Sequence, residues 1–380
     1  MTHEVCLEPA ITPANAPAFL LDWELTMKCN LDCSYCMTGT YGGHDNTTHH
    51  PPLDECLKTL DFMYQYVDLY MRYKVSGLRK VVLNVYGGEA MHHPDIVEIL
   101  KQARERHLAG NYAWHLTITT TTNLIMLDRK LAQVVDYVDE FTCSYHTECT
   151  PKQKQQFKEN LQIIKLSKRK LKCVVLMHNH PERFQDAQAM IDWLKEQEIE
   201  TLPRQLDSSP TTFNYTPGQV TWFDDLYKRR SYNASPEVSA DQGLTDLSSQ
   251  GRACCGGRQL CEDQRYKERT FFTQNKFTGW SCSVNWFFLH IKQVNGEIFV
   301  NKDCKMNFDN QVGPIGNLSA TNELLSQLDS QLENNTLPVI QCAKDSCYCG
   351  LCAPKARDRD TYDNIVFKYH PAYYQERLKQ

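Results

Sequence analysis

The sequence predicts an α/β fold with a parallel sheet, followed by a smaller cysteine-rich C-terminal domain. Apolar runs typical of strands alternate with amphipathic stretches typical of helices through the first 205 of the 380 residues. This alternation implies parallel strands that are joined by right-handed crossover helices. Beyond residue 250 the pattern changes, because nine of the seventeen cysteines lie there.

The first part of the chain contains six candidate strands and the helices that connect them. We expect strands at residues 19–26, 80–86, 115–121, 140–144, 172–177 and 200–204. We expect helices at residues 53–72, 94–107, 128–135, 152–167 and 183–197. Six strands are fewer than the eight of a closed parallel barrel, and barrels of this kind bind ligands at the carboxyl ends of their strands.

The composition divides the chain into four segments. Residues 1–17 are an N-terminal tail, and residues 18–205 form the sheet domain. Residues 206–250 are rich in Ser, Thr, Pro, Asn and Asp, which suggests a linker or mobile loop. Residues 251–380 form the cysteine-rich domain.

Composition and charge exclude several classes of protein. Hydrophobic residues make up 41% and charged residues 23%, as in an ordinary soluble protein. No run approaches the roughly 18 apolar residues that span a membrane, and the N-terminus does not resemble a signal peptide. The cysteines are therefore expected to be reduced thiolates that hold metal in a cytoplasm. The net charge of −5 argues against a broad nucleic-acid surface.

The first motif is a C-x3-C-x2-C sequence directly after the first strand, formed by Cys29, Cys33 and Cys36. Three thiolates from one loop can bind three irons of a [4Fe–4S] cluster and leave the fourth iron open for chemistry. Zinc is the alternative. A structural zinc site usually draws four ligands from two paired clusters, and no second pair lies close in the sequence.

The second motif, Gly87-Gly88-Glu89, follows the second strand. Glycines allow a backbone to approach a ligand closely, and a carboxylate suits an ammonium group. Both motifs follow strands of one parallel sheet, so we expect them at the same edge of that sheet.

Together the two motifs resemble the radical S-adenosylmethionine (SAM) family. The resemblance implies a partial (β/α)6 TIM-like barrel and a cluster on the three cysteines, with SAM chelating the open iron through its amino and carboxylate groups. Tyr35 corresponds to the aromatic residue that the family carries before its last cysteine. Gly87, Gly88 and Glu89 correspond to the motif that binds the SAM amino group, although Ala90 replaces the usual proline.

The same resemblance nominates residues at the ends of the next three strands. Thr121 and Asn123 resemble the family's Thr-Asn turn near the SAM ribose or carboxylate. Ser144 and His146 follow the fourth strand, where the family often has a polar SAM contact. Met177 ends the fifth strand and is expected at the same rim.

The C-terminal segment resembles the SPASM/twitch extension of radical SAM enzymes. Asn295-Gly296 between two apolar runs predicts a hairpin. The resemblance implies an auxiliary [4Fe–4S] cluster held by the cysteines around and beyond this hairpin, which are Cys282, Cys304, Cys342, Cys347, Cys349 and Cys352. The spacings depart from the family pattern. Six cysteines suffice for one four-thiolate cluster with two to spare, so we expect one auxiliary cluster. A zinc knuckle is the structural alternative.

Three further cysteines have no definite assignment. Cys254, Cys255 and Cys261 could bind another cluster, or one could donate a hydrogen atom to a substrate radical.

The activity implied by the resemblance is reductive cleavage of SAM to a 5′-deoxyadenosyl radical, which abstracts a hydrogen atom from a substrate C–H bond. We expect a peptide, protein or small-molecule substrate and an electron donor such as flavodoxin or ferredoxin. The first strand begins near the start of the chain, so a leader-peptide domain is not evident. The alternatives are modification of a nucleotide or nucleic acid, and a non-catalytic metal-binding scaffold.

Overall fold

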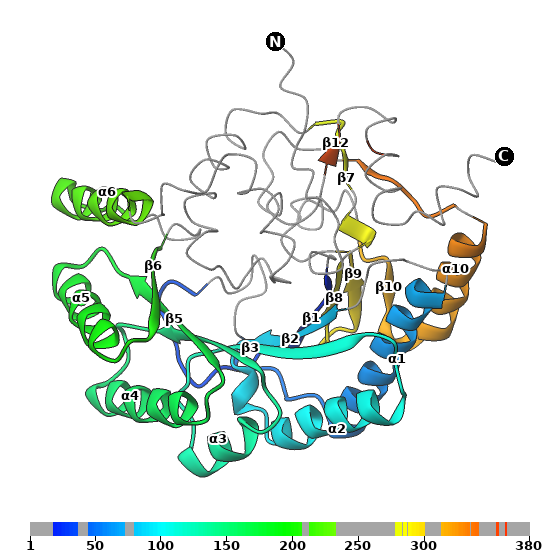
Figure 1. Ribbon diagram of the computed structural model, residues 1–380, viewed down its shortest axis with the longest axis horizontal. Helices are drawn as coiled ribbons and strands as arrows, with labels where there is room; N and C mark the ends of the chain where they lie inside the picture. Colours follow the sequence, from blue (N-terminus) through cyan, green and yellow to red (C-terminus); the bar gives the residue numbers. More distant parts are fainter. Residues whose placement is uncertain are drawn as a thin grey trace.

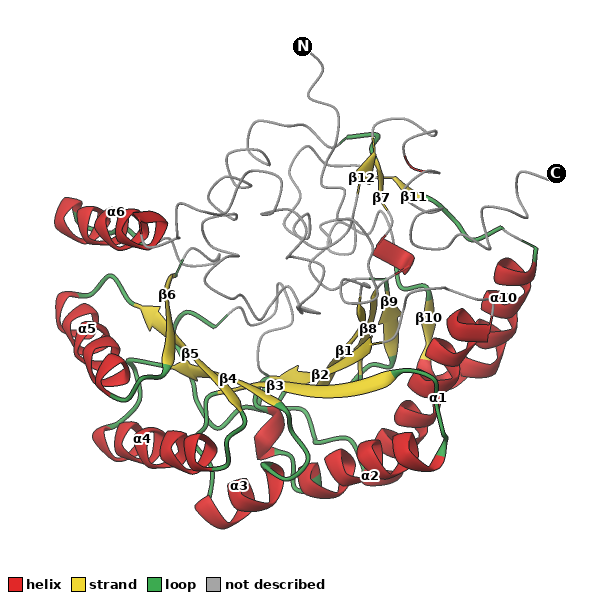
Figure 2. Ribbon diagram, in the orientation of Figure 1, coloured by secondary structure: helices red, strands yellow, loops and turns green. Residues whose placement is uncertain are grey.

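The computed structural model describes residues 18–36, 45–72, 80–206, 213–232, 278–282, 284–286, 288–300, 313–334, 336–341, 355–356 and 362. Their main feature is a nine-stranded sheet with the strand order β10-β9-β8-β1-β2-β3-β4-β5-β6. The sheet curves, and helices cover its outer, convex side (Figures 1 and 2).

The six expected strands are confirmed, and neighbouring strands pair in parallel. They are β1 (Ala18–Thr26), β2 (Lys80–Gly87), β3 (His115–Thr122), β4 (Glu140–Tyr145), β5 (Lys170–Met177) and β6 (Glu200–Gln205). The five expected helices lie between them. They are α1 (Leu53–Arg72), α2 (Ile96–Ala109), α3 (Asp128–Val134), α4 (Pro151–Leu166) and α5 (Pro181–Glu196). The short helix η1 (Ala90–His92) follows β2.

The expected linker is wrong in part, because it contains the helix α6 (Pro217–Tyr232). Thr216 and Gln219 form reciprocal hydrogen bonds of 2.9 and 3.3 Å between backbone N–H groups and side-chain oxygens at its start. This arrangement is a capping box, and Pro217 suits the first helical position. Phe223 is buried and packs edge-on against Phe184 of α5. Trp222 packs against Phe184 as well. The capping box and these apolar contacts therefore support a helix in a segment of polar composition.

The expected C-terminal hairpin is confirmed, but it belongs to the main sheet. β8 (Phe288–Lys292) pairs in parallel with β1, and β9 (Glu297–Phe299) pairs antiparallel with β8. Gly296 in the turn has a φ of 71°, a conformation that suits glycine. The boundary expected at residue 251 therefore does not separate two independent sheets.

Short elements complete the described C-terminal part. β10 (Gly316–Asn317) pairs with β9, and α10 (Thr321–Glu333) lies beside α1 (Figure 1). The helices η2 (Val284–Trp286) and η3 (Leu318–Ala320) are single turns. A second sheet has the order β11 (Ile340–Gln341), β7 (Ser281–Cys282), β12 (Lys355–Ala356). No helix among the described residues is long and apolar enough to cross a membrane.

The two faces of the main sheet differ in polarity. Along β1, Phe19 and Trp23 are fully buried, and Phe19 packs against Tyr70 of α1 with ring centroids 5.4 Å apart. On the opposite face, Asn84 donates a hydrogen bond of 2.9 Å to Asp22 and accepts one of 3.1 Å from Thr119. Asp22, Asn84 and Thr119 are register partners on β1, β2 and β3. The inner face is therefore polar, while the outer face forms the core with the helices.

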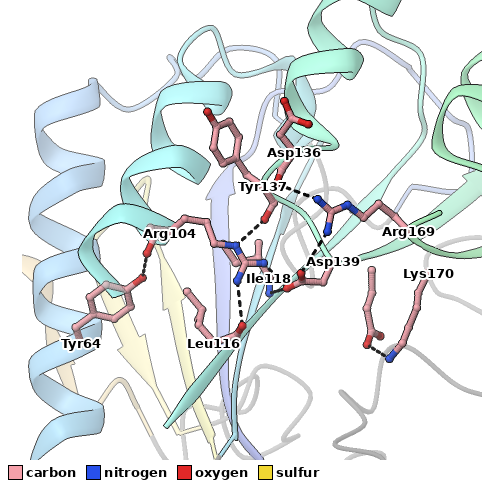
Figure 3. A network of polar contacts seen from close by, with 11 residues as sticks. Tyr64, Arg104, Leu116, Ile118, Asp136, Tyr137, Asp139, Arg169 and Lys170 are labelled. Atoms are coloured by element: carbon pink, nitrogen blue, oxygen red, sulfur yellow. Dashed lines mark hydrogen bonds and ion pairs between the residues drawn. The ribbon is translucent and has the colours of Figure 1, made fainter. Parts of the chain in front are cut away.

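An ion-pair network joins the elements near the amino ends of β3, β4 and β5 (Figure 3). Arg104 of α2 donates to the carbonyls of Tyr137 and Leu116 at 3.0 Å each and pairs with Asp139. Asp139 also accepts the N–H of Ile118 at 2.8 Å. Polar groups at this end of a parallel barrel usually serve stability, whereas ligands bind at the other end.

Candidate functional site

The cysteine loop directly follows β1. Cys29, Cys33 and Cys36 are half-buried, and the N–H of Cys36 donates to the carbonyl of Cys33 at 2.9 Å. This bond closes a β-turn with Ser34 and Tyr35 at its centre. The pKa of Cys29 is raised to about 11, mainly by burial and to a smaller extent by the charges of Glu89 and Cys36. Metal binding at Cys29 would therefore release a proton from a thiol that is otherwise neutral.

The donor set of this loop fits an iron–sulfur cluster. Three thiols come from one loop, and two N–H groups point at the sulfur of Cys29, from Leu31 at 3.4 Å and from Asn123 at 3.7 Å. Such hydrogen bonds tune cluster potentials. Among the described residues, no three His, Cys, Asp or Glu side chains are arranged to hold a single metal ion. In a cluster each thiolate binds its own iron, so the ligands need not meet at one point.

The glycines after β2 pack against the segment that leads into the cysteine loop. The N–H of Gly88 donates to the carbonyl of Thr26, and the N–H of Glu89 donates to that of Lys28, both at 2.8 Å. A Cβ atom on Gly87 would lie 2.0 Å from the Thr26 oxygen, and one on Gly88 would lie 2.4 Å from the Met27 oxygen. The glycines are therefore required by this backbone contact, in addition to the ligand approach expected from the sequence.

Glu89 is buried and joins the ends of β2 and β3. Its carboxylate accepts hydrogen bonds from the N–H of Met91 at 2.9 Å, the hydroxyl of Thr122 at 2.8 Å and the N–H of Asn123 at 2.6 Å. Burial raises the pKa of this carboxyl to about 7, and the three hydrogen bonds oppose the rise. A cation bound nearby would favour the ionised form.

Asn123 connects Glu89 with the cysteine loop. Its side-chain amide donates to the Oδ1 of Asn30 at 2.7 Å and to the sulfur of Cys29. Asn30 in turn donates to the carbonyl of Ile125 at 2.6 Å. The two sequence motifs are thus linked through the turn after β3.

Tyr35 and His146 anchor the other end of the loop. Their rings stack with centroids 5.9 Å apart, and the Tyr35 hydroxyl lies 2.9 Å from the Nδ1 of His146. The sulfur of Cys33 lies 3.3 Å from the same nitrogen. Burial lowers the pKa of His146 to about 4, so its imidazole is neutral at physiological pH.

Three other residues were expected to contact SAM, and they do not all lie in comparable positions. Thr121 and Ser144 are half-buried on β3 and β4. The expected SAM contact at Met177 is wrong, because the Met177 side chain is fully buried in the core. It lies on the same face of β5 as Cys173 and Val175. A cofactor contact from the Met177 side chain does not fit this position.

Of the cysteines expected in the C-terminal segment, the structure describes one. Cys282 is buried in β7, where its register partners are Ile340 of β11 and Lys355 of β12. The others lie outside the described residues, namely Cys254, Cys255, Cys261, Cys304, Cys342, Cys347, Cys349 and Cys352.

Three polar residues around the loop were missed by the sequence analysis. Asn30 lies inside the loop itself. Glu148, after β4, contacts the loop, and Arg183 of α5 pairs with Glu148. The position of Glu148 just after a strand end was the available signal, but it also fits the approach to a helix.

Comparison with known proteins agrees with this geometry. Residues 23–194, from β1 to α5, match the model of the Radical SAM superfamily. This stretch is a radical SAM domain. An AdoMet-dependent heme synthase of Methanosarcina barkeri (strain Fusaro / DSM 804) is 31% identical over 110 residues, which cover 29% of this chain and 27% of that protein. The match therefore spans about a quarter of the relative's length.

Solved structures resemble the chain over nearly its whole length. Native anSMEcpe with bound AdoMet aligns with a TM-score of 0.50 and 15% identity, covering 95% of this chain and 96% of that one. The same protein with AdoMet and the Kp18Cys peptide gives 0.51 and 14%, covering 95% and 98%. At such low sequence identity, the similarity of these structures to the chain shows a shared fold and nothing more.

The contact of Gly88 with the loop backbone yields a prediction. Gly88→Ala should lower the free energy of unfolding by about 1–3 kcal/mol, because the new methyl group overlaps backbone atoms that cannot move away cheaply. Urea unfolding of the cluster-free protein measures this. Gly218→Ala is the control, since a Cβ atom there meets nothing within 4 Å. Equal free energies of unfolding for the two variants would contradict a close contact between Gly88 and the loop backbone.

Proposed function

We propose that this protein is a radical SAM enzyme. One observation carries the proposal: within a radical SAM domain, the cysteine loop and the Gly-Gly-Glu motif form one hydrogen-bonded assembly through Asn123. When bound, the cluster supplies the electron that cleaves SAM to methionine and a 5′-deoxyadenosyl radical, which abstracts a hydrogen atom from a substrate C–H bond.

The residues of the chain have separate roles in this proposal. Cys29, Cys33 and Cys36 hold the cluster. The backbone at Gly87 and Gly88 would bind the SAM amino group, and ionised Glu89 would add a negative charge that favours this ammonium. Further SAM contacts come from the same rim, from Tyr35, Thr121, Asn123, Ser144 and His146.

We further propose a peptide, protein or small-molecule substrate. The fold resembles that of anSMEcpe, whose structure with AdoMet and a peptide supports the peptide class. The polar inner face at Asp22, Asn84 and Thr119 suits a polar substrate. A flavodoxin or ferredoxin would supply electrons, and a reducing cytoplasm would preserve the thiolates.

The auxiliary cluster is a separate proposal. The small sheet supports it, because β11 ends one residue before Cys342 and β12 begins three residues after Cys352. Both strands pair with β7 at Cys282. The described residues that flank the terminal cysteine segment, Gln341 and Lys355, therefore both belong to strands paired with β7, as a cluster shared with Cys282 would require.

The first test removes one cluster ligand. Cys33→Ala should abolish formation of 5′-deoxyadenosine by the anaerobically reconstituted, dithionite-reduced protein with SAM, because two thiolates no longer hold a reactive cluster. Mass spectrometry of the products measures it. Cys56→Ala, which removes a thiol buried in α1, should keep the activity. Wild-type product formation by Cys33→Ala would refute the proposal.

The second test separates the two clusters. The variant with Cys29, Cys33 and Cys36 all replaced by alanine should still take up about four irons and remain brown, because the auxiliary ligands are intact. Iron analysis and the visible spectrum measure this. Tightly bound zinc after anaerobic purification would instead identify the zinc knuckle, and a colourless, metal-free variant would also contradict the auxiliary cluster.

A further inference from the structure

The turn that carries Cys33 and Cys36 is held from outside by one carboxylate. Glu148, between β4 and α4, accepts the backbone N–H of Ser34 through one oxygen and the Ser34 hydroxyl through the other, both at 2.6 Å. Ser34 is a central residue of the β-turn that the Cys36 N–H and the Cys33 carbonyl close. Glu148 therefore fixes the backbone and the side chain of the residue next to Cys33.

Arg183 balances the charge of this carboxylate. It lies in the first turn of α5, pairs with Glu148, and donates to the Nε2 of His178 at 2.9 Å. Burial and the Arg183 charge both lower the pKa of His178, so its neutral ring can accept this bond. The pairing matters because an unbalanced negative charge beside the turn would oppose the thiolate form of Cys33.

The regions after β4 and β5 thus meet at the tip of the cysteine loop. Glu148 is largely buried, with 13% of its side chain exposed, whereas Arg183 is 40% exposed. Hydrogen bonds to a largely buried carboxylate are charge-assisted and stronger than neutral ones. The two hydrogen bonds from Ser34 to Glu148 fix the orientation of Ser34, which the β-turn alone would not fix.

We propose that Glu148 is a positioning residue for the cluster ligands Cys33 and Cys36, acting through Ser34 with Arg183 as its counter-ion. The inference rests on the proposed function, since it assumes that the loop holds a cluster. Glu148 itself binds neither iron nor SAM. Its effect is to keep the two sulfurs at the spacing that a bound cluster needs, which slows loss of the cluster.

The test measures how fast the cluster loses iron. Glu148→Gln in the full-length, anaerobically reconstituted protein should release iron to an excess of a ferrous chelator about tenfold faster than wild type, as expected for losing one charge-assisted hydrogen bond. Iron release from the cysteine loop is identified as the kinetic phase that is absent when Cys29, Cys33 and Cys36 are all replaced by alanine. Glu159→Gln is the matched control, because Glu159 is exposed on α4 and contacts Gln155. This control should release iron at the wild-type rate.

A double-mutant cycle tests the route through Ser34. Ser34→Ala removes one of the two bonds and should by itself speed iron release. Glu148→Gln should then have a smaller effect in the Ser34→Ala background than in wild type, because the two share an interaction. A merely structural role of Glu148 would give independent effects and a matching loss of stability in the cluster-free protein. If Glu148→Gln does not fold, unchanged iron release by Ser34→Ala still overturns the inference.

Two failures are distinguishable. If wild-type protein takes up no cluster at the cysteine loop, the proposed function is wrong. If it takes up a cluster and Glu148→Gln releases iron no faster than wild type, only the positioning role is wrong.

Discussion

The site depends on hydrogen bonds that hold the cysteine loop to the neighbouring strand ends. Because β1 to β4 are parallel, the loops that follow them meet at one edge of the sheet. Gly88 holds the start of the loop by its backbone, Asn123 contacts Cys29, and Glu148 holds the turn at Ser34. A short loop with half-buried thiols could otherwise sample many arrangements, and only a few would present three sulfurs to one cluster.

The ion-pair network and the candidate functional site are located at opposite ends of the same sheet. Arg104 and Asp139 join the amino ends of the strands to α2 in a network that involves none of the candidate site residues (Figure 3). At the carboxyl ends, Glu89 is buried, and burial raises the pKa of its carboxyl to about 7. Burying a carboxylate costs free energy. A costly buried carboxylate beside the cysteine loop fits a site for a cationic ligand.

Strand and helix positions followed from apolar periodicity. The three cysteines were nominated by their spacing and by the family resemblance, and their role as cluster ligands stays a prediction. Two residues were missed because their roles come from tertiary contacts, whereas the errors at α6 and Met177 had local signals that were not used. Glu148 and Asn30 act on partners that only the fold brings near, so local sequence gave little sign of them. Composition suggested a linker where a capping box starts α6. Met177 could have been excluded by strand alternation, which puts it on the same face as the buried Cys173.

The most direct test of the central claim is the electron paramagnetic resonance spectrum of the reduced, reconstituted protein with and without SAM. If the cysteine loop holds a [4Fe–4S] cluster with an open iron, SAM should change the spectrum of that cluster, because a new ligand alters the electronic structure of the iron it binds. The change should be absent from the triple-alanine variant, in which only the proposed auxiliary cluster would give a signal. A wild-type spectrum that SAM leaves unaltered would contradict the account.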